Sequence, residues 1–240
     1  MTYTKSAPET IQEMFGKIAA RYDLCNKALS FNLHRLWNRT LVREILNGTP
    51  PSKILDLCAG TGDIAIEFAH QSKGADVTLL DFCAPMLDVA KEKAQSEAFK
   101  EAVFSYVEGD ATLLPFNEGS FSNVSVAYGI RNIQNPLKCV QEAHRVLVPG
   151  GTLGILELTR PKNPLVGFFH SLYLKTFVPM IGSLVTQDKE AYQYLNKSIK
   201  QFQTASALER MLIETGFVNV RTIPASLGIA SIIVGTKSPS

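Results

Sequence analysis

The stretch Ile54-Leu55-Asp56-Leu57-Cys58-Ala59-Gly60-Thr61-Gly62-Asp63 decides the fold of this chain. It begins as an apolar strand, continues into a glycine-rich turn and leads into a helix. Glycine lets a ligand approach the backbone closely, and the free N–H groups at the start of a helix can face that ligand. The stretch therefore predicts a ligand site at the end of a buried strand.

The turn alone does not identify the ligand. The pattern Gly60-x-Gly62-x-x-Ala65 also fits a dinucleotide site, and Asp81, at the end of the next predicted strand, could accept hydrogen bonds from ribose hydroxyls in either case. Two further carboxylates favour a different ligand. Asp56 and Asp63 flank the turn, where they would repel a pyrophosphate and attract the ammonium group of a methionine moiety.

A second acidic loop agrees with this choice. Gly109-Asp110-Ala111 follows the third predicted strand, where a carboxylate can accept from the adenine amino group and a backbone N–H can donate to the ring. Together these features describe adenosine joined to an amino acid, so we predict S-adenosylmethionine as the methyl donor. The predicted cofactor-binding residues are Asp56, Gly60, Thr61, Gly62, Asp81, Phe82, Asp110, Ala111 and Ala127.

From Lys53 onward, short apolar runs alternate with amphipathic stretches, which is typical of βαβ units around a parallel sheet. A short connection near the C-terminus makes the last two strands antiparallel. This layout predicts a class I S-adenosylmethionine-dependent methyltransferase, an α/β fold with a Rossmann-like, mostly parallel sheet and a C-terminal antiparallel hairpin. The expected strands are 53–58, 77–81, 103–107, 122–127, 152–158, 217–223 and 229–236, and the expected helices are 64–70, 85–95, 137–147 and 206–215.

The chain of 240 residues is expected to form one domain. Apolar residues at helical spacing predict an N-terminal helical cap over residues 1–50, and residues 160–200 are expected to form a substrate-side insertion or lid. The 24 basic and 22 acidic side chains leave a net charge of +2, which gives no strong attraction to nucleic acid. The four cysteines form no C-x-x-C pair and no signal peptide is evident, so a reducing, cytoplasmic setting is expected.

Two longer motifs resemble one family. Residues 22–37, Tyr-Asp-Leu-Cys-Asn-Lys-Ala-Leu-Ser-Phe-Asn-Leu-His-Arg-Leu-Trp, and residues 145–157, Arg-Val-Leu-Val-Pro-Gly-Gly-Thr-Leu-Gly-Ile-Leu-Glu, are similar to segments of the C-methyltransferases of menaquinone and ubiquinone biosynthesis. The resemblance covers nearly the whole chain. It implies C-methylation of a polyprenyl quinol ring, with demethylmenaquinol as the main candidate acceptor and a benzoquinol as the alternative.

The resemblance also suggests which residues act on the acceptor. A quinol hydroxyl with a pKa near ~10 resists deprotonation at neutral pH, so assistance from a base or a cation is expected. The predicted catalytic residues are Arg131, Asn132 and His34, with Asp23 as a further candidate. Tyr22 and Trp37 could form walls of the ring pocket. No metal site is expected.

Residues 165–185 form the most apolar segment of the chain. His170, Lys175 and Pro179 argue against a membrane span, so we expect either a lid or interfacial helix that admits the isoprenoid tail, or a plain core helix. The expected partners are the polyprenyl quinol and a membrane surface at the inner face of the cytoplasmic membrane, with a homodimer considered and no nucleic acid. Remaining alternatives are methylation of another small molecule and a non-catalytic cofactor-binding subunit of a quinone-biosynthetic assembly.

Overall fold

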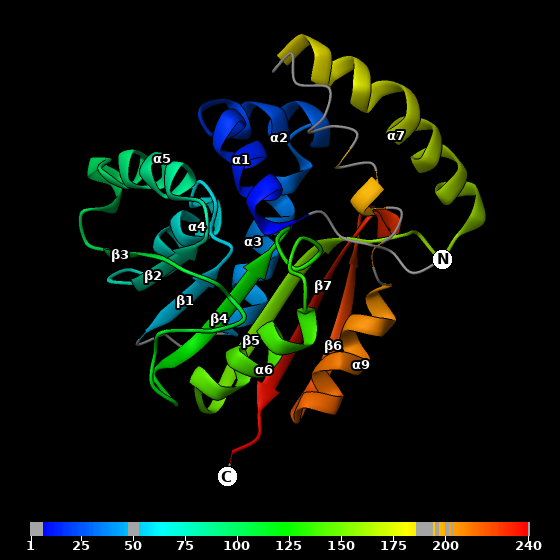
Figure 1. Cartoon of the computed structure of the whole chain (residues 1–240). Coiled ribbons are helices and arrows are strands. Elements are labelled where there is room, and N and C mark those ends of the chain that lie inside the picture. Colours follow the sequence, from blue (N-terminus) through cyan, green and yellow to red (C-terminus); the bar gives the residue numbers. More distant parts are fainter. Residues whose placement is uncertain are drawn as a thin grey trace.

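A seven-stranded sheet forms the centre of the structure (Figure 1). The order of its strands is β3-β2-β1-β4-β5-β7-β6. All pairs from β3 to β5 are parallel, whereas β7 is antiparallel to both β5 and β6. The strands are β1 (Ile54–Leu57), β2 (Asp76–Asp81), β3 (Val103–Glu108), β4 (Phe121–Ala127), β5 (Leu147–Leu158), β6 (Phe217–Ala225) and β7 (Ala230–Lys237).

The computed structural model describes residues 7–47, 53–185, 194, 197–199, 202 and 204–239. The described helices are α1 (Pro8–Ile18), α2 (Tyr22–Ser30), α3 (Leu33–Leu46), α4 (Asp63–Gln71), α5 (Ala84–Ala94), α6 (Pro136–Val146), α7 (Pro164–Val185) and α9 (Ala205–Thr215), with short 3-10 turns at Ala19–Arg21, Glu97–Phe99 and Ser226–Gly228. The predicted fold class is confirmed.

Helices cover both faces of the sheet, and β1 is therefore buried on both sides. Leu55 and Leu57 pack into the cluster that α6 and α9 complete, whereas Ile54 packs into the cluster that α3, α4 and α5 complete. This alternation follows from the two-residue period of a strand. A parallel sheet covered on both faces leaves the edge formed by the carboxyl ends of its strands for a ligand.

Helix α3 approaches the sheet more closely than a side chain would allow. A Cβ added at Gly154 of β5 would lie 2.5 Å from Cγ1 of Ile45 and 2.9 Å from Cδ1 of Leu41. Glycine is therefore required where α3 crosses β5. The N-terminal helices are attached to the sheet through this contact.

Strand β5 is longer than the sequence suggests. We expected a strand only from Thr152, after the Pro149-Gly150-Gly151 turn, but the strand begins at Leu147. Leu147 pairs with Phe121, and a shift in register separates that pair from the Asn123–Thr152 pair. A bulge of this kind accommodates extra residues without ending the pairing.

Helices α1, α2 and α7 lie on the same side of the molecule, above the sheet in Figure 1. Helix α7 contacts α2, and Tyr173 of α7 donates a hydrogen bond of 2.5 Å from Oη to the carbonyl oxygen of Leu29. The expected cap (1–50) and insertion (160–200) therefore meet at the carboxyl edge of the strands. Residues 186–193, 195, 196 and 200 of the insertion lie outside the described residues.

Candidate active site

The glycine-rich turn after β1 takes backbone conformations that favour glycine. Gly60 has φ +53°, and Gly62, at the start of α4, has φ +81°. A Cβ added at Gly62 would lie 3.0 Å from Cβ of Ala90 and 3.3 Å from Cδ2 of Leu79. Gly62 thus serves two needs at once, a left-handed turn and the close packing of the turn against β2 and α5.

Asp81 holds this turn from the end of β2. Its Oδ2 accepts a hydrogen bond of 2.8 Å from the backbone N–H of Gly60, and its Oδ1 accepts one of 2.9 Å from that of Cys83. Burial raises the pKa of the Asp81 carboxyl, and the backbone N–H donors oppose that rise. Each carboxylate oxygen still has a lone pair for a ligand hydroxyl.

A cavity of about 290 Å³ lies beside the turn. It has two walls of different chemistry. Helices α1 and α2 supply an apolar cover from Ile11, Phe15 and Tyr22. The sheet edge and its loops supply six of the predicted cofactor residues: Gly60, Asp81, Phe82, Asp110, Ala111 and Ala127.

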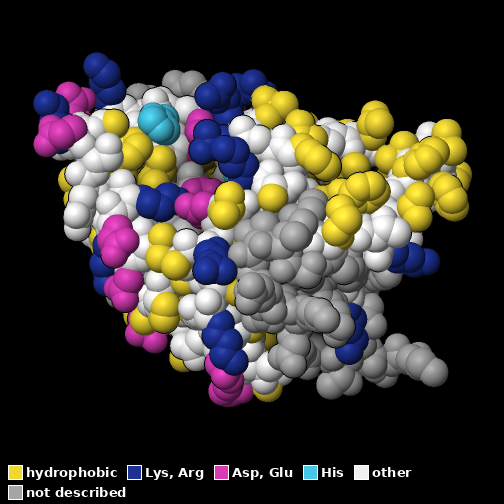
Figure 2. Space-filling model, turned by 90° about the horizontal axis from the view of Figure 1, so that it is seen from above, with side chains coloured by type: hydrophobic (Ala, Val, Ile, Leu, Met, Phe, Trp, Pro, Cys, Tyr) yellow, Lys and Arg dark blue, Asp and Glu magenta, His cyan; other side chains and the backbone are white. Residues whose placement is uncertain are grey.

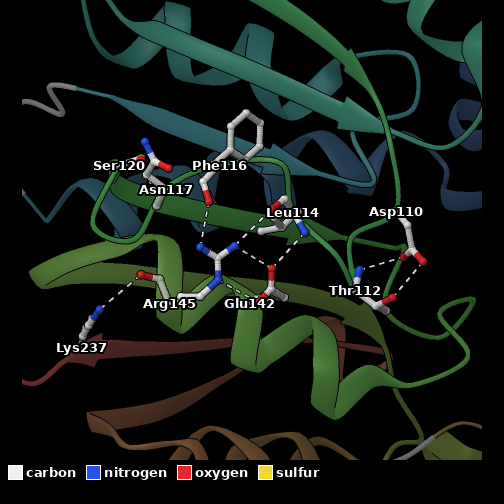
Figure 3. Close-up of polar contacts among 9 residues, drawn as sticks. All are labelled: Asp110, Thr112, Leu114, Phe116, Asn117, Ser120, Glu142, Arg145 and Lys237. Carbon is white, nitrogen blue, oxygen red and sulfur yellow. Dashed lines mark hydrogen bonds and ion pairs between the residues drawn. The ribbon is translucent and has the colours of Figure 1, made fainter.

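The loop with Asp110 is held from below by α6 (Figure 3). Arg145 contacts Glu142 through two hydrogen bonds, Nε to Oε1 at 2.9 Å and Nη2 to Oε2 at 2.7 Å. The guanidinium also donates to the carbonyl oxygens of Phe116 (2.8 Å) and Leu114 (3.1 Å), and Glu142 accepts from the N–H of Leu114 (2.9 Å). Its bonds to Arg145 lower the pKa of Glu142. This clamp, Glu142 with Arg145, fixes the loop that leads from the cavity.

Asp110 itself has two roles in the structure. It lines the cavity, and its carboxylate accepts hydrogen bonds of 2.8 Å from both the backbone N–H and the hydroxyl of Thr112 (Figure 3). These bonds close a turn and hold the carboxylate in place. Its free lone pairs can still accept from an adenine amino group.

Three predicted cofactor residues do not line the cavity. Gly62 and Thr61 lie in the turn, and the Thr61 hydroxyl donates to Oδ1 of Asp23 at 2.6 Å. Asp56 is buried in β1 and its Oδ1 accepts from the hydroxyl of Ser125 at 2.6 Å. Burial raises the pKa of Asp56 to about 7, and the nearby carboxylates of Asp81 and Asp63 add to that rise, whereas the hydrogen bond from Ser125 opposes it. Its Oδ2 has no hydrogen-bond partner within the described residues.

The carboxylate of Asp63, which we expected to attract an ammonium group, forms an ion pair with Lys93 of α5. Lys93 also donates to Oδ2 of Asp23 at 2.7 Å. The cluster of Asp23, Thr61, Asp63 and Lys93 therefore ties α2 to the glycine-rich turn and to α5. Within the described residues, Oδ2 of Asp56 is a buried carboxylate oxygen without a hydrogen-bond partner.

These residues fit S-adenosylmethionine. Asp81 can accept from ribose hydroxyls, Phe82 and Asp110 border a space for adenine, and the buried Asp56 carboxylate lacks a positive partner that an ammonium group could supply through the turn. No phosphate-binding side chain is required for this arrangement, and the acidic surroundings disfavour a pyrophosphate.

A second cavity of about 190 Å³ adjoins the first. The two cavities share Tyr22 and Tyr128, which stand between them. The walls of the second cavity come from α2, α3, α7 and the loop after β4, and they are rich in aromatic side chains. The lining includes His34, Trp37, Arg131, His170 and Tyr173.

The predicted catalytic residues are divided between the cavities. His34 and Arg131 line the second cavity, whereas Asn132 lines the first. Oδ1 of Asn132 accepts a hydrogen bond of 2.9 Å from the hydroxyl of Tyr194. Burial lowers the pKa of His34, which favours the neutral imidazole.

Arg131 is buried and paired with Glu157 of β5. Its Nη1 lies 2.6 Å from Oε1 of Glu157 and also donates to the carbonyl oxygen of Tyr128. Burial has the largest single effect and opposes the charge, but Glu157, together with Tyr22 and Tyr194, outweighs it, so the pKa of Arg131 is raised. Its Nε has no hydrogen-bond partner within the described residues.

Several residues of the second cavity were not predicted. Ser30, His170 and Tyr173 line it without having been predicted as site residues, since aromatic and polar residues in helices are common. One signal was present at Tyr128, which precedes Gly129. A Cβ at Gly129 would lie 2.3 Å from Cβ of Cys58, so glycine is required where the two loops meet, and it marks the approach of the β4 loop to the turn after β1.

The sheet order, the glycine-rich turn that leads into α4 and the acidic end of β2 define a class I S-adenosylmethionine-dependent methyltransferase. Comparisons with known proteins agree with this class. The chain belongs to the ubiE/COQ5 methyltransferase family, whose model matches residues 1–237.

Two relatives and one solved structure illustrate the match. The demethylmenaquinone methyltransferase of Protochlamydia amoebophila is 46% identical over 237 residues, which cover 98% of each chain. The ubiquinone/menaquinone biosynthesis C-methyltransferase of Ruegeria sp. is 34% identical, covering 95% of this chain and 90% of that protein. A SAM-dependent methyltransferase from Thermotoga maritima superposes with a TM-score of 0.65 at 17% identity, covering 95% of this chain and all of that one, which shows the shared fold.

Proposed function

We propose that this chain transfers the methyl group of S-adenosylmethionine to a ring carbon of a polyprenyl quinol, with demethylmenaquinol as the preferred acceptor. The observation that carries this proposal is the second cavity, which is lined by aromatic side chains. It joins the first cavity, called the cofactor cavity from here on, at Tyr22 and Tyr128. A subunit that only bound the cofactor would not need such a cavity. Names of the relatives support the naphthoquinol, because the 46% identical relative is a demethylmenaquinone methyltransferase.

The chain's residues have three tasks in this reaction. When bound, S-adenosylmethionine supplies a methyl group that the sulfonium already activates. The protein aligns the ring carbon with that methyl group, excludes water and helps the acceptor hydroxyl to lose its proton. Alignment requires the reacting atoms to come within ~3–3.5 Å, and Tyr22 and Tyr128 stand at the junction where they would meet.

Charge at the second cavity favours an ionised acceptor. Arg131 remains protonated beside the cavity, although its pair with Glu157 offsets part of its field. The guanidinium of Arg131 also keeps an Nε without a hydrogen-bond partner within the described residues. Asn132, held by Tyr194, can orient a ring oxygen or a relay water from the side of the cofactor cavity. His34 is the neutral group that can accept the proton.

A direct experiment tests the acceptor. The purified protein and S-[methyl-³H]adenosylmethionine are incubated with reduced demethylmenaquinone and, in parallel, with a reduced polyprenyl benzoquinone of the same tail length. We expect incorporation of label into the naphthoquinol at the higher kcat/KM. Label in the benzoquinol alone would overturn the acceptor assignment, and label in neither quinol would overturn the proposed function.

We further propose that the chain meets its acceptor at a membrane surface, through α7. The exposed apolar side chains of α7 are Leu165, Phe168, Phe169, Leu172, Phe177 and Met180. Figure 2 shows hydrophobic side chains gathered on the end of the molecule where α7 lies. None of the helices in the described part of the chain has both the length and the apolar character needed to cross a membrane. An interfacial position fits this helix better, since its opposite side lines the second cavity through His170, Tyr173 and Leu174.

The charge on α7 fits an anionic bilayer. Helix α7 contains no acidic residue, and Lys175 is its single charged side chain. Next to it, Phe31 of the α2–α3 turn is 71% exposed and its ring lies 6.1 Å from that of Tyr173. The apolar surface therefore continues from α7 to the mouth of the second cavity, where an isoprenoid tail would leave it.

Vesicle binding tests the membrane proposal. Co-flotation with vesicles of phosphatidylglycerol and phosphatidylethanolamine should fall at least ~10-fold when Phe168 and Phe169 are both replaced by serine, since burying one phenylalanine contributes about 1.5–3 kcal/mol. The matched control is Ile213→Ser, which removes a side chain of α9 that is 55% exposed. Equal flotation of the double variant and the control, or no flotation of the unchanged protein, would refute the membrane proposal without touching the acceptor assay.

A further inference from the structure

Ser30 and His34 form a hydrogen-bonded chain beside the second cavity. The hydroxyl of Ser30 donates to the carbonyl oxygen of Asn26, with an O–O distance of 2.6 Å. The same Oγ lies 2.6 Å from Nδ1 of His34, and the backbone N–H of His34 points to it at 3.4 Å. Ser30 and His34 both line the cavity.

The donor and acceptor roles in this chain are fixed by its first member. A carbonyl oxygen has no hydrogen to donate, so the single hydroxyl hydrogen of Ser30 must go to Asn26. The oxygen of Ser30 then has only lone pairs to offer to His34. Nδ1 of His34 must therefore carry the hydrogen, and Nε2 of a neutral imidazole keeps its lone pair. Within the described residues, the hydrogen bond of the His34 ring is made by Nδ1, and none is seen at Nε2.

The backbone between the two residues is strained in a way that brings them together. Ser30 is the last residue of α2, and His34 lies in the first turn of α3. The two residues between these helices are Phe31, with φ +49°, and Asn32, with φ +66°. Left-handed conformations of residues other than glycine are uncommon, and a phenylalanine there carries strain. The surroundings hold this turn, and its result is the contact between Ser30 and His34.

Resting on the proposed function, we propose that Ser30 is a positioning residue that holds His34 in its Nδ1-protonated tautomer, so that Nε2 accepts the proton of the quinol hydroxyl. The O–H electron pair stays on the oxygen and enters the ring. The adjacent ring carbon forms the new bond to the methyl carbon, while the sulfur keeps the electron pair of the bond that breaks. The ring carbon then loses its hydrogen as a proton to water, and His34 returns its proton to the oxygen, so one proton is released in each turnover.

The charges around His34 agree with a neutral base. Burial has the largest effect on its pKa and lowers it, which keeps Nε2 free at neutral pH. The nearby carboxylates oppose that effect in part, and nearby cations add to it. The charged and titratable groups around His34 are Asp23, Arg35, Asp63 and Lys93, together with Tyr22, Tyr128, Arg131, His170 and Tyr173 of the cavity.

Ser30 could instead serve only as a helix cap, because its Oγ accepts from the backbone N–H of His34. The test therefore needs a measurement that a cap does not influence. The ¹⁵N chemical shifts of the imidazole nitrogens report the tautomer directly. The chain has only four histidines, so the signals of His34 can be assigned as those missing from a His34→Gln variant.

Three substitutions give the expected pattern. In the unchanged protein and in Ser30→Thr, which keeps the hydroxyl, Nδ1 of His34 should carry the hydrogen. In Ser30→Ala the Nε2-protonated tautomer should appear, and kcat for the quinol should fall up to ~10-fold because a hydrogen bond worth about 0.5–1.5 kcal/mol no longer selects the tautomer. His34→Gln should lower kcat by ~10²–10⁴-fold and remove the loss of activity at acidic pH that protonation of His34 causes.

Thr40→Ala is the matched control, because its hydroxyl makes the same type of bond, 2.8 Å to the carbonyl oxygen of Leu36, on the exposed face of α3. It should change neither the tautomer nor kcat. An unchanged tautomer in Ser30→Ala, or a changed tautomer with an unchanged kcat, would overturn the proposal. The tautomer is measured without acceptor, so a failure of the quinol assay itself would count against the proposed function and not against the positioning by Ser30.

Discussion

The buried pair of Arg131 and Glu157 makes the strongest prediction, because it separates stability from catalysis. The side chain of Arg131 is 5% exposed and that of Glu157 is fully buried. Arg131→Ala leaves the Glu157 carboxylate buried without its partner, which typically destabilises a protein by ~3–5 kcal/mol. For a chain of this size, we expect the melting temperature to fall by ~6–20 °C.

The double variant Arg131→Met/Glu157→Gln removes both charges and keeps the volume. Replacing a buried ion pair by neutral residues of similar size is often neutral for stability, so most of the loss should be recovered. The glutamine oxygen can still accept from the N–H of Leu158, a bond of 2.7 Å in the structure. Stability and activity should therefore respond differently in this variant.

Both variants should lose kcat by ~10²–10⁴-fold if Arg131 stabilises the ionised quinol, while the Kd of S-adenosylmethionine changes little. Part of the lost activity should return at high pH, where the quinol hydroxyl ionises without assistance. Thermal unfolding, calorimetric titration of the cofactor and the kcat–pH profile are measured on both variants. A double variant that regains kcat together with stability would show that Arg131 serves only to neutralise Glu157.

Three further predictions concern the cofactor side. Asp81→Asn should weaken S-adenosylmethionine binding about 10–100-fold, since a charge-assisted hydrogen bond contributes ~1.5–3 kcal/mol, and unchanged affinity in calorimetry would remove Asp81 from the ribose site. Arg145→Met should raise the KM for S-adenosylmethionine and leave the kcat at saturation nearly unchanged, because Arg145 holds the loop of Asp110 without lining the cavity. A lower kcat with a normal KM would contradict this role. Asp56 has a folded pKa raised to about 7 against ~3.9 when unfolded, so its contribution to stability is full below pH ~4 and is lost as pH rises through about 7, by at most ~4 kcal/mol. Urea unfolding at several pH values should show this fall in the unchanged protein but not in Asp56→Asn, and parallel curves would refute it.

The arrangement of the two cavities gives a physical picture of how a hydrophobic acceptor could meet a polar cofactor. The cofactor cavity lies between the loops of the sheet edge and the cap helices α1 and α2, whereas the second cavity is lined mainly by helices of the N-terminal cap and the 160–200 insertion. Tyr22 lines both, and it belongs to the cap that the cluster of Asp23 and Lys93 ties to α5. The cap thus takes part in both cavities.

The sequence by itself determined the features that depend on neighbours along the chain. The apolar periods predicted most helices and strands to within a few residues, and Gly60 and Gly62 stand out because their backbone conformations exclude most other residues. Asp81 at the end of β2 and Asp110 in the loop after β3 were predicted for another reason. Parallel strands bring their carboxyl ends to one edge of the sheet, so residues that follow such strands come together there. Six of the nine predicted cofactor residues accordingly line one cavity.

Only the tertiary structure decided which polar groups are paired and which remain free. Arg131 and Glu157 are 26 residues apart in the chain, and Thr61 meets Asp23 across 38, so no local pattern could reveal either contact. The same holds for the second cavity, whose walls combine α2 and α3 with α7, which is far from them in sequence. Local backbone preferences are encoded within a few residues, whereas burial, and with it the pKa of Asp56 or His34, is set by whichever distant segments pack against a side chain.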